Sequence, residues 1–272
     1  MGQLEGKTAV ILGAATPGNI GQVTARLFAA EGARVMVAGR HEDALADLAE
    51  EIGGHYALCD ISSHEEVHAL AQKARETMGR VDAAINTTGW GLLASFLEIT
   101  QEELDRITDL QFKGVHHFLQ AFVKVMGEQE PTGGSLISLS SASTKALLNN
   151  HAAYIASKRA GEAMIECVAN DYGHLGIKAN TVSPAFTHSP MTEGAFATPG
   201  LVDAFLPRYP LARLNTSEDV AQACLWLCSD QAFVTGQNIQ PNGGVILRGN
   251  PQARDIEAAV GAAMAKMQSE DG

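Results

Sequence analysis

The sequence predicts an α/β protein: one Rossmann-like domain with a doubly wound parallel sheet of about seven strands and helices on both faces. Three observations indicate this class. The length of 272 residues suits one such domain. Short apolar runs alternate with longer helical patterns, which is typical of repeated strand–helix units. These runs are apolar almost throughout, as expected for strands that are covered on both faces.

The predicted strands are seven short, nearly continuous apolar stretches. Helical patterns lie between them. The apolar residues of Glu42–Ile52 fall on one helical face. Thr100 and Glu103 have the spacing of a capping box that begins a helix, and Ser217, followed by two acidic residues, begins another. The predicted strands are Thr8–Leu12, Arg34–Ala38, His55–Leu58, Asp82–Ile85, Ser135–Leu139, Lys178–Val182 and Val245–Leu247.

We expect residues 1–250 to form the dinucleotide-binding and catalytic domain. Within it, residues 185–212 form a long loop that contains several prolines and aromatic residues. Such a loop in a compact domain is typical of a lid over a site. Residues 251–272 are expected to form a helical extension, with a helix over Ala253–Met267.

Composition limits the function classes. The formal net charge of -12 argues against non-specific binding to nucleic acid or anionic membranes. No apolar run is long enough to span a bilayer, and the N-terminus has no apolar signal core. The cysteines Cys59, Cys167, Cys224 and Cys228 form no Cys-x-x-Cys pair. We therefore expect a reduced, cytoplasmic protein without nucleic-acid or membrane partners.

A glycine-rich turn, Gly13–Gly21 with Gly18 inside it, joins the first strand to the first helical pattern. Glycines allow a sharp turn and let a pyrophosphate approach the helix N-terminus, where free N–H groups favour anions. The first half also resembles a Walker A loop, but Asn19 stands where that motif requires lysine. The turn therefore favours dinucleotide binding over a nucleoside-triphosphatase site.

The residue after the second strand bears on the choice of cofactor. An acidic residue there would accept a hydrogen bond from the ribose 2′-hydroxyl of NAD. The chain has Arg40 instead, and a guanidinium can pair with a 2′-phosphate. The sequence therefore favours NADP(H) over NAD(H).

His64-Glu-Glu-Val-His68 matches the His-Glu-x-x-His pattern of zinc proteases. A catalytic zinc site takes three protein ligands, and no suitable third ligand follows in the nearby helix. We interpret the segment as the start of a short, polar, solvated helix. His116 and His117 are adjacent, so they point to different helical faces and form no site by themselves. No metal site is expected.

Tyr154 and Lys158 are the strongest catalytic candidates. Residues four apart share a helical face, so the lysine ammonium would lie beside the phenol. An ammonium lowers the pKa of a tyrosine from its usual value near ~10, and Tyr154 can then exchange a proton with a carbonyl oxygen or an alcohol. Ser138, Ser140 and Ser141 end the preceding strand, where α/β sheets place their sites, and a hydroxyl there can orient the reacting oxygen.

Taken in order, these motifs resemble those of the short-chain dehydrogenase/reductase family from roughly Leu4 to Leu247. The resemblance implies hydride transfer between NAD(P) and a ketone or secondary alcohol. It also implies that Ser141 binds the substrate oxygen, Tyr154 is the acid/base and Lys158 holds the nicotinamide ribose. The matching segments are the glycine loop, Cys59-Asp60-Ile-Ser, Asn86-Thr-Thr-Gly89, Ser141 with Tyr154 and Lys158, and Asn180-x-Val-x-Pro184.

The same resemblance implies a cofactor site along the carboxyl ends of the strands. Asp60 would contact the adenine, and Asn86 would brace the central strands. Residues 182–189 would line the nicotinamide, with Ser189 near its carboxamide. The predicted cofactor residues are Gly13, Thr16, Gly18, Asn19, Ile20, Gly21, Arg40, Asp60, Ile61, Asn86, Thr87, Thr88, Gly89, Tyr154, Lys158, Pro184, Ala185, Phe186 and Ser189.

Four features depart from the family pattern. The glycine loop has one extra residue in each interval. Gln111 stands where the family has an asparagine that supports a proton-relay water, so it joins the predicted catalytic group with a different reach. Thr88 and Ala185 replace the usual residues of their motifs. The serine, tyrosine and lysine are all retained.

Apolar and aromatic residues near the predicted site suggest a hydrophobic, cyclic or aromatic carbonyl substrate. Each of them can equally be a core or interface residue. An NAD-dependent alcohol dehydrogenase, a 3-oxoacyl-type reductase and a non-catalytic nucleotide-binding scaffold are the alternatives. The resemblance implies a homo-oligomer, a tetramer or dimer, that assembles through helix pairs including the Tyr154 helix. The predicted substrate-binding residues are Ser141, Trp90, His151, Phe186 and Phe196.

Overall fold

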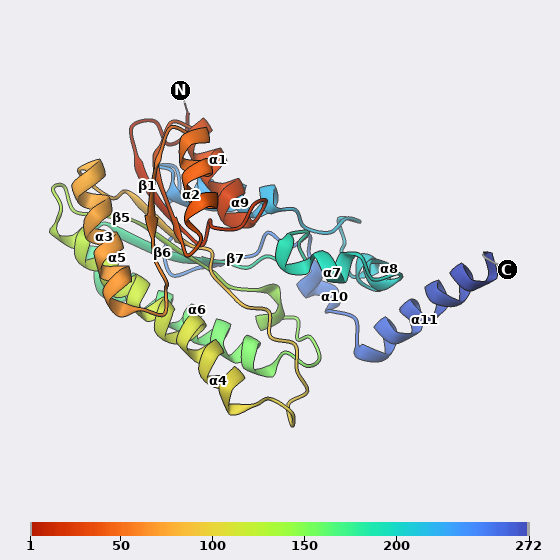
Figure 1. The fold of residues 1–272 in the computed structure, drawn as a ribbon. Helices are drawn as coiled ribbons and strands as arrows, with labels where there is room; N and C mark the ends of the chain where they lie inside the picture. Colours follow the sequence, from red (N-terminus) through yellow and green to blue (C-terminus); the bar gives the residue numbers. More distant parts are fainter. Residues whose placement is uncertain (1, 271–272) are drawn as a thin grey trace.

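The computed structural model describes residues 2–270, so Met1, Asp271 and Gly272, the ends of the two predicted units, lie outside the described residues. Seven parallel strands form one sheet in the order β3-β2-β1-β4-β5-β6-β7, with helices on both faces (Figure 1). The predicted single-domain Rossmann-like class is therefore confirmed. No helix in the described part of the chain is long and apolar enough to cross a membrane.

Six of the predicted strands are present, and their ends move by at most one residue. The chain crosses over between β3 and β4, which lie on opposite sides of β1 and β2. The strands are β1 Thr8–Leu12, β2 Arg34–Gly39, β3 His55–Leu58, β4 Ala83–Asn86, β5 Gly134–Leu139, β6 Ile177–Val182 and β7 Asn238–Ile239.

The seventh predicted strand is wrong. Val245–Leu247 lies in a short helix, α10 Val245–Arg248, and the seventh strand is the two-residue β7 beside β6. Gly243 and Gly244 both have positive φ, 62° and 82°, and they turn the chain just before Val245. Short apolar runs do not by themselves distinguish a strand from a buried helical turn.

Each face of the sheet buries its own apolar cluster. Along β1, Val10 and Leu12 belong to one cluster and Ile11 to the other, as the two-residue strand period requires. The two sets of helices are α1 Ile20–Ala30, α2 Glu42–Glu51 and α9 Ser217–Cys228 on one face, and α3 His64–Met78, α5 Gly114–Glu128 and α6 Ala152–Tyr172 on the other (Figure 1).

The predicted helix starts are confirmed. Thr100 and Glu103 form a capping box that begins α4 Gln101–Thr108. α9 begins at Ser217, and the residue that caps it is Thr216. The predicted helix over Glu42–Ile52 is α2, with Ile52 as its C-cap.

The predicted helix after His64 begins with exposed polar residues, as expected, but it is longer and more buried than predicted. α3 has 15 residues and buries five of them, including Val67 and Leu70. These apolar residues recur at helical spacing and pack in the same cluster as α5. Gly79, with φ at 81°, ends the helix.

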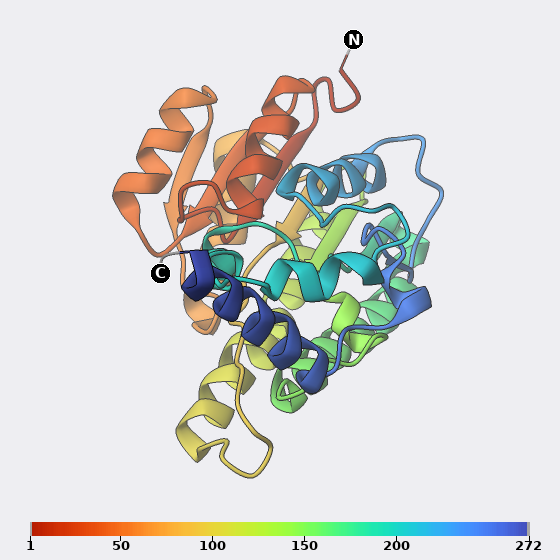
Figure 2. The ribbon, with the colours of Figure 1, turned by 90° about the vertical axis from the view of Figure 1, so that its right-hand side faces the viewer.

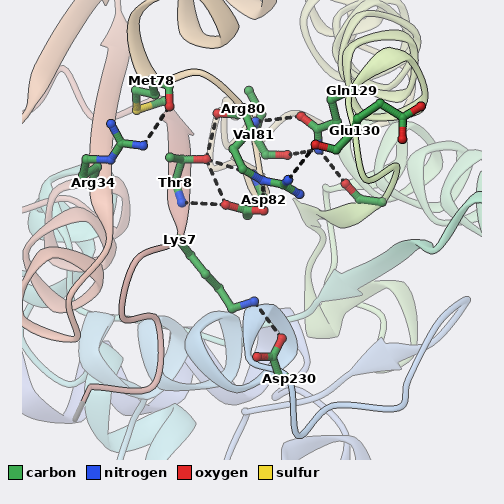
Figure 3. A network of polar contacts seen from close by, with 11 residues as sticks. Lys7, Thr8, Arg34, Met78, Arg80, Val81, Asp82, Gln129, Glu130 and Asp230 are labelled. Carbon is green, nitrogen blue, oxygen red and sulfur yellow. Dashed lines mark hydrogen bonds and ion pairs between the residues drawn. The ribbon is translucent and has the colours of Figure 1, made fainter.

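Polar contacts close the amino ends of the strands (Figure 3). Asp82 accepts a hydrogen bond from the Thr8 N–H at 2.9 Å and pairs with Arg80 at 2.7 Å. The Gln129 amide bonds both main-chain groups of Val81, at 2.9 and 3.0 Å. These contacts satisfy the Thr8 N–H at the start of β1 and both main-chain groups of Val81, two residues before β4.

Short helices fill the predicted lid. They are η4 Pro190–Thr192, α7 Glu193–Phe196, α8 Leu201–Phe205 and η5 Leu206–Arg208. The last helix, α11 Ala253–Glu270, covers the predicted terminal helix and contacts α8 (Figure 2). The role of residues 185–212 as a substrate lid stays a prediction.

Candidate active site

The predicted catalytic side chains meet where β5 ends and α6 begins. Ser141 follows β5 and caps the short helix η2 Ala142–Thr144. Tyr154 and Lys158 lie on the first turns of α6, with Lys158 Nζ 5.9 Å from the centre of the Tyr154 ring. Ser141 lies close enough to the Tyr154 hydroxyl to lower its pKa, and Ser141 Oγ is 2.8 Å from Ser143 Oγ. Lys158 Nζ donates to the carbonyl oxygens of Leu139 at 2.9 Å and Thr88 at 3.4 Å. The serine, the phenol and the ammonium therefore form one group.

Burial shifts both ionisable groups toward their neutral forms. It raises the pKa of the Tyr154 phenol, and the hydrogen bond to Ser141 acts in the opposite direction. It lowers the pKa of Lys158 to about 8, against the charge of Glu162, which raises it. The sequence predicts that Lys158 lowers the pKa of Tyr154, but in the structure burial raises this pKa and the group that lowers it is Ser141. A phenol of this kind keeps its proton at neutral pH and suits the role of an acid.

Gln111 lies in a single π-helical turn, η1 Asp109–Lys113, between α4 and α5. Its buried side chain accepts a hydrogen bond from the Trp90 N–H at 2.8 Å and donates to Ser157 Oγ at 2.8 Å. π-helical turns inside α-helices are frequent at functional sites. The Gln111 side chain therefore ties the loop after β4 to α6 just behind Tyr154.

The glycine loop lies against the start of α1. A Cβ atom on Gly13 or Gly21 would come within 2.5 and 2.7 Å of Thr87 Oγ1, so no larger residue fits at either position. Thr87 Oγ1 donates to the Leu12 carbonyl at 2.9 Å. The loop and the end of β4 are thus in direct contact. Close packing requires glycine at both positions, and at Gly13 the positive φ of 103° favours it as well.

Asn19 organises the N-terminus of α1. Its side chain accepts from the Gln22 N–H at 2.9 Å and donates to the Gly13 carbonyl at 2.7 Å. Ile20 is the first helical residue, and residues 16–18 of the turn are exposed. An exposed turn at a helix N-terminus, with Gly18 at φ 73° and open space where its Cβ would be, fits a pyrophosphate.

Arg40 and Asp60 lie together at the ends of β2 and β3. Arg40 Nη1 is 3.7 Å from Asp60 Oδ2, and the Arg40 side chain is 66% exposed. Burial alone would raise the pKa of Asp60, but hydrogen bonds from Ser62 and the charge of Arg40 hold it below its usual value. Ile61 is buried against Gly114, the first residue of α5. An exposed guanidinium at this edge can reach an anion.

Asn86 joins the two central strands. Its Nδ2 donates to Ser138 Oγ at 3.3 Å, and its Oδ1 accepts from the N–H and hydroxyl of Thr88. Gly89 lies where a Cβ would be 3.4 Å from both Gln111 Oε1 and Lys158 Nζ. The loop after β4 therefore passes directly beside Gln111 and Lys158.

The aromatic residues of the lid pack mainly on one another. The Phe186 ring lies 4.5 Å from the Phe196 ring and 4.7 Å from the Phe205 ring, centre to centre. The Phe186 N–H donates to the buried Tyr209 hydroxyl at 2.9 Å, and burial raises the pKa of Tyr209 to about 12. This cluster, together with Pro184 and Ala185, joins the lid to the end of β6. Phe186 packs against the buried cluster around Tyr209, Phe196 is partly buried beside it, and both remain candidates for contact with substrate.

The other predicted substrate residues surround the start of α6. His151 is the N-cap of α6, and its ring lies 5.9 Å from that of Tyr154. The Trp90 ring is covered by the Arg106 guanidinium at 4.2 Å. Ser189 forms a capping box with Thr192 at the start of η4. The structure brings His151 to Tyr154, whereas Trp90 contacts Arg106, and Ser189, which is predicted to lie at the nicotinamide, contacts Thr192.

The histidines of α3 meet α5 away from the catalytic group. The Nε2 atoms of His64 and His68 lie 3.3 and 3.2 Å from Gln120 Oε1, and the His117 ring lies 5.2 Å from that of His64. The sequence spacing did not predict that His117 lies beside His64 and His68. Within residues 2–270, no group of three or more His, Cys, Asp or Glu side chains could hold a metal ion.

Sequence reasoning missed one buried carboxylate. Glu162 lies on α6 four residues after Lys158 and is 8% exposed. Its position could have been found, because residues 154, 158 and 162 share a helical face. Nothing in the sequence identified its partners, which come from other elements.

The chain matches known proteins over most of its length. The family model described as "Enoyl-(Acyl carrier protein) reductase" matches residues 13–246. The chain is 32% identical over 252 residues to a mitochondrial borneol dehydrogenase of Lavandula x intermedia, covering 89% of this chain and 92% of that one. It is 31% identical over 251 residues to a 3-oxoacyl-acyl-carrier-protein reductase of Thermotoga maritima, covering 90% and 100%. A solved short-chain type dehydrogenase/reductase from Mycobacterium ulcerans superposes with a TM-score of 0.87 at 25% identity, covering 94% and 98%.

Proposed function

Because the chain belongs to the short-chain dehydrogenase/reductase family of NAD(P)-dependent oxidoreductases that act on CH–OH groups, we propose that it interconverts a ketone and a secondary alcohol with NADP(H). The observation that carries the proposal is the single group formed by Ser141, Tyr154 and Lys158 at the end of β5. The residues of the glycine loop and of the ends of β2 and β4 fit a dinucleotide. NADP(H), when bound, supplies or accepts the hydride.

Each catalytic side chain has one role in this proposal. Ser141 donates a hydrogen bond to the reacting oxygen and orients it. Tyr154 gives its phenolic proton to that oxygen during reduction and takes it back during oxidation. Lys158, held by the carbonyls of Leu139 and Thr88, stabilises the phenolate that remains. Gln111 keeps the loop after β4 in place over this group.

Arg40 supports the preference for NADP(H). Its side chain is exposed at the end of β2, where the ribose of the cofactor is expected, and it has only a long ion pair with Asp60. A free guanidinium edge can bind a 2′-phosphate with two parallel hydrogen bonds. No acidic residue stands at position 40 to accept from a 2′-hydroxyl.

The proposed substrate is a hydrophobic, cyclic or aromatic small molecule. The aromatic lid residues Phe186 and Phe196 and the Trp90 loop support this class. A 3-oxoacyl-type reductase is the second candidate, because the Thermotoga maritima relative with that name is covered over its full length. Arg208, the one arginine within residues 185–212, pairs with Asp255 at 2.9 Å, so the lid offers little free positive charge to an acidic carrier.

We further propose a homo-oligomer, a tetramer or dimer, located in the cytoplasm. α5 and α6 line an apolar surface groove of about 810 Å³ that includes Leu119, Met164 and Val168. A second copy of the same helix pair would cover it with a matching surface. The four cysteines are unpaired thiols, which is typical of a reducing compartment.

The test of the function is oxidation of NADPH and NADH with a panel of cyclic, aromatic and 3-oxoacyl carbonyl compounds. The wild-type protein should oxidise NADPH with at least one of them. Tyr154→Phe removes only the hydroxyl, so we expect turnover to fall by about 10²-fold or more. Binding of NADPH, followed by its fluorescence, should stay close to that of the wild type. A Tyr154→Phe protein that keeps most of its turnover would contradict the proposed acid.

A further inference from the structure

The buried Glu162 carboxylate is surrounded by donors from three other elements. Its Oε1 accepts hydrogen bonds from Ser140 Oγ at 2.5 Å, Thr144 Oγ1 at 2.8 Å and Asn238 Nδ2 at 2.8 Å. These donors come from the end of β5, from η2 and from β7. Burying a carboxylate is costly unless such donors are present, so this is a specific arrangement. The catalytic roles proposed above make no use of it.

Two of the donors flank Ser141 in the sequence. Ser140 directly precedes it, and Thr144 ends the short helix that it caps. The Thr144 N–H also donates to the Ser141 carbonyl at 3.0 Å. Glu162 therefore holds the turn that carries the Ser141 hydroxyl from both ends, and it does so from the same helix that carries Tyr154.

Glu162 is also the nearest counter-charge to Lys158 on their common helical face. Its charge opposes the effect of burial on the Lys158 pKa. The groups that contact Glu162 from β5, η2 and β7 are hydroxyls and an amide, and those that contact Lys158 Nζ are main-chain carbonyls. The other ionisable groups on this part of α6 are Tyr154 and Arg159, whose guanidinium donates to the Thr144 carbonyl at 2.9 Å.

We propose that Glu162 is a positioning residue for the catalytic group. Its carboxylate keeps the Ser141 turn aligned with Tyr154 and places a fixed negative charge one turn from Lys158. This inference rests on the proposed function, because Ser141, Tyr154 and Lys158 are catalytic only under that proposal.

Glu162→Gln tests the charge, since it keeps the size of the side chain and one acceptor oxygen. We expect kcat for carbonyl reduction to fall about tenfold or more, with little change in the KM for NADPH. The loss of activity at high pH should begin about one pH unit lower, because Lys158 loses its counter-charge. Glu166→Gln is the matched control: it makes the same change at an exposed position one turn further along α6 and should behave as wild type.

Glu162→Asp tests the geometry, since it keeps the charge and shortens the reach. Its kcat should fall while its high-pH limit stays closer to that of the wild type than in Glu162→Gln. A Glu162→Gln protein with the kcat and pH profile of the wild type overturns the proposal. It is also overturned if the pH at which activity is lost moves equally in Glu162→Gln and Glu162→Asp.

Circular dichroism and thermal melting show whether each variant folds. If Glu162→Gln does not fold, Ser140→Ala tests the proposal instead. It removes one hydrogen-bond donor to Glu162 and leaves the carboxylate charge in place. It should lower kcat several-fold with an unchanged KM for NADPH, and an unchanged kcat overturns the proposal. Wild type and Tyr154→Phe are measured in the same assay. An inactive wild type or an active Tyr154→Phe protein indicates that the proposed function is wrong. If the wild type is active and Tyr154→Phe is inactive, an unexpected result for the Glu162 variants contradicts only the role of Glu162.

Discussion

Burial moves the Tyr154 phenol and the Lys158 ammonium toward their neutral forms: it raises the pKa of Tyr154 and lowers the pKa of Lys158 to about 8. Tyr154 then holds a proton that it can give to a carbonyl oxygen at neutral pH. Lys158 stays mostly charged below about 8 and is neutral well above it. The proposed reduction needs the protonated phenol and the ammonium together, and both are present when the pH is below about 8.

The activity should therefore depend on pH in a defined direction. We expect kcat/KM for carbonyl reduction to be steady below the Lys158 pKa of about 8 and to fall as the pH rises through it, because the neutral amine no longer stabilises the phenolate. A pH profile at saturating NADPH measures this. A profile that stays flat to well above that pH would contradict the assigned role of Lys158.

Arg40 should determine the choice of cofactor. In Arg40→Asp, a carboxylate would repel the 2′-phosphate of NADPH and accept a hydrogen bond from the 2′-hydroxyl of NADH. The KM for NADPH should rise by about tenfold or more, and the KM for NADH should fall or stay constant. Arg254→Asp, at an 86% exposed position on α11, is the charge-matched control. An unchanged ratio of the two KM values would refute the 2′-phosphate role.

At the scale of elements, the lid is held by packing from both sides. Tyr209 binds the start of the lid, and α11 lies against α8 (Figure 2). Gly200, the N-cap of α8, has φ at 77°, and a Cβ there would come within 2.4 Å of the Ala259 carbonyl of α11. The close contact between these two helices therefore depends on this one glycine.

Gly200→Ala should separate α11 from α8. We expect the free energy of unfolding to fall by roughly 1–3 kcal/mol, from the positive φ and the clash together. The KM for the carbonyl substrate should rise while the KM for NADPH changes little, since the glycine loop is untouched. Gly194→Ala in α7 is the control, because a Cβ there meets nothing within 4 Å. Thermal melting and steady-state kinetics check both variants, and equal effects would refute the coupling between α11 and the lid.

At the scale of the whole molecule, two features lie outside the sheet and its core: a groove on the α5–α6 helix pair and the terminal helix α11. α5 and α6 leave an apolar groove at the surface. The opposite end of the molecule has α11, which projects beyond the sheet (Figure 1). An apolar groove of this size on a helix pair is typical of a protein interface.

Ala163→Glu places a charge in that groove at an exposed position that a monomer tolerates. The proposed oligomer should dissociate to smaller species, which light scattering during size-exclusion chromatography would detect. Ala69→Glu makes the same change at an exposed position of α3, outside the groove-lining residues, and should leave the mass unchanged. If both variants keep the wild-type mass, the α5–α6 surface is not the interface.

The sequence by itself determined the features that depend on local order. Strand and helix periods, the capping box at Thr100, the helix start at Ser217, and the spacing of Ser141, Tyr154 and Lys158 are all properties of neighbouring residues. Six strands and the fold class follow from them. The motif spacing also brought three side chains to one place, because a helix face and a strand end have fixed geometry.

Only the tertiary structure decided which distant residues meet. The donors of Glu162 come from three elements, His117 joins His64 across two helices, and Gln111 reaches Ser157. It also decided that Val245 begins a helical turn rather than a strand, because Gly243 and Gly244 redirect the chain. The pKa directions of Tyr154 and Lys158 belong here too. Burial by surrounding elements outweighs the Ser141 hydrogen bond at Tyr154 and the charge of Glu162 at Lys158, and burial is a property of the packed molecule.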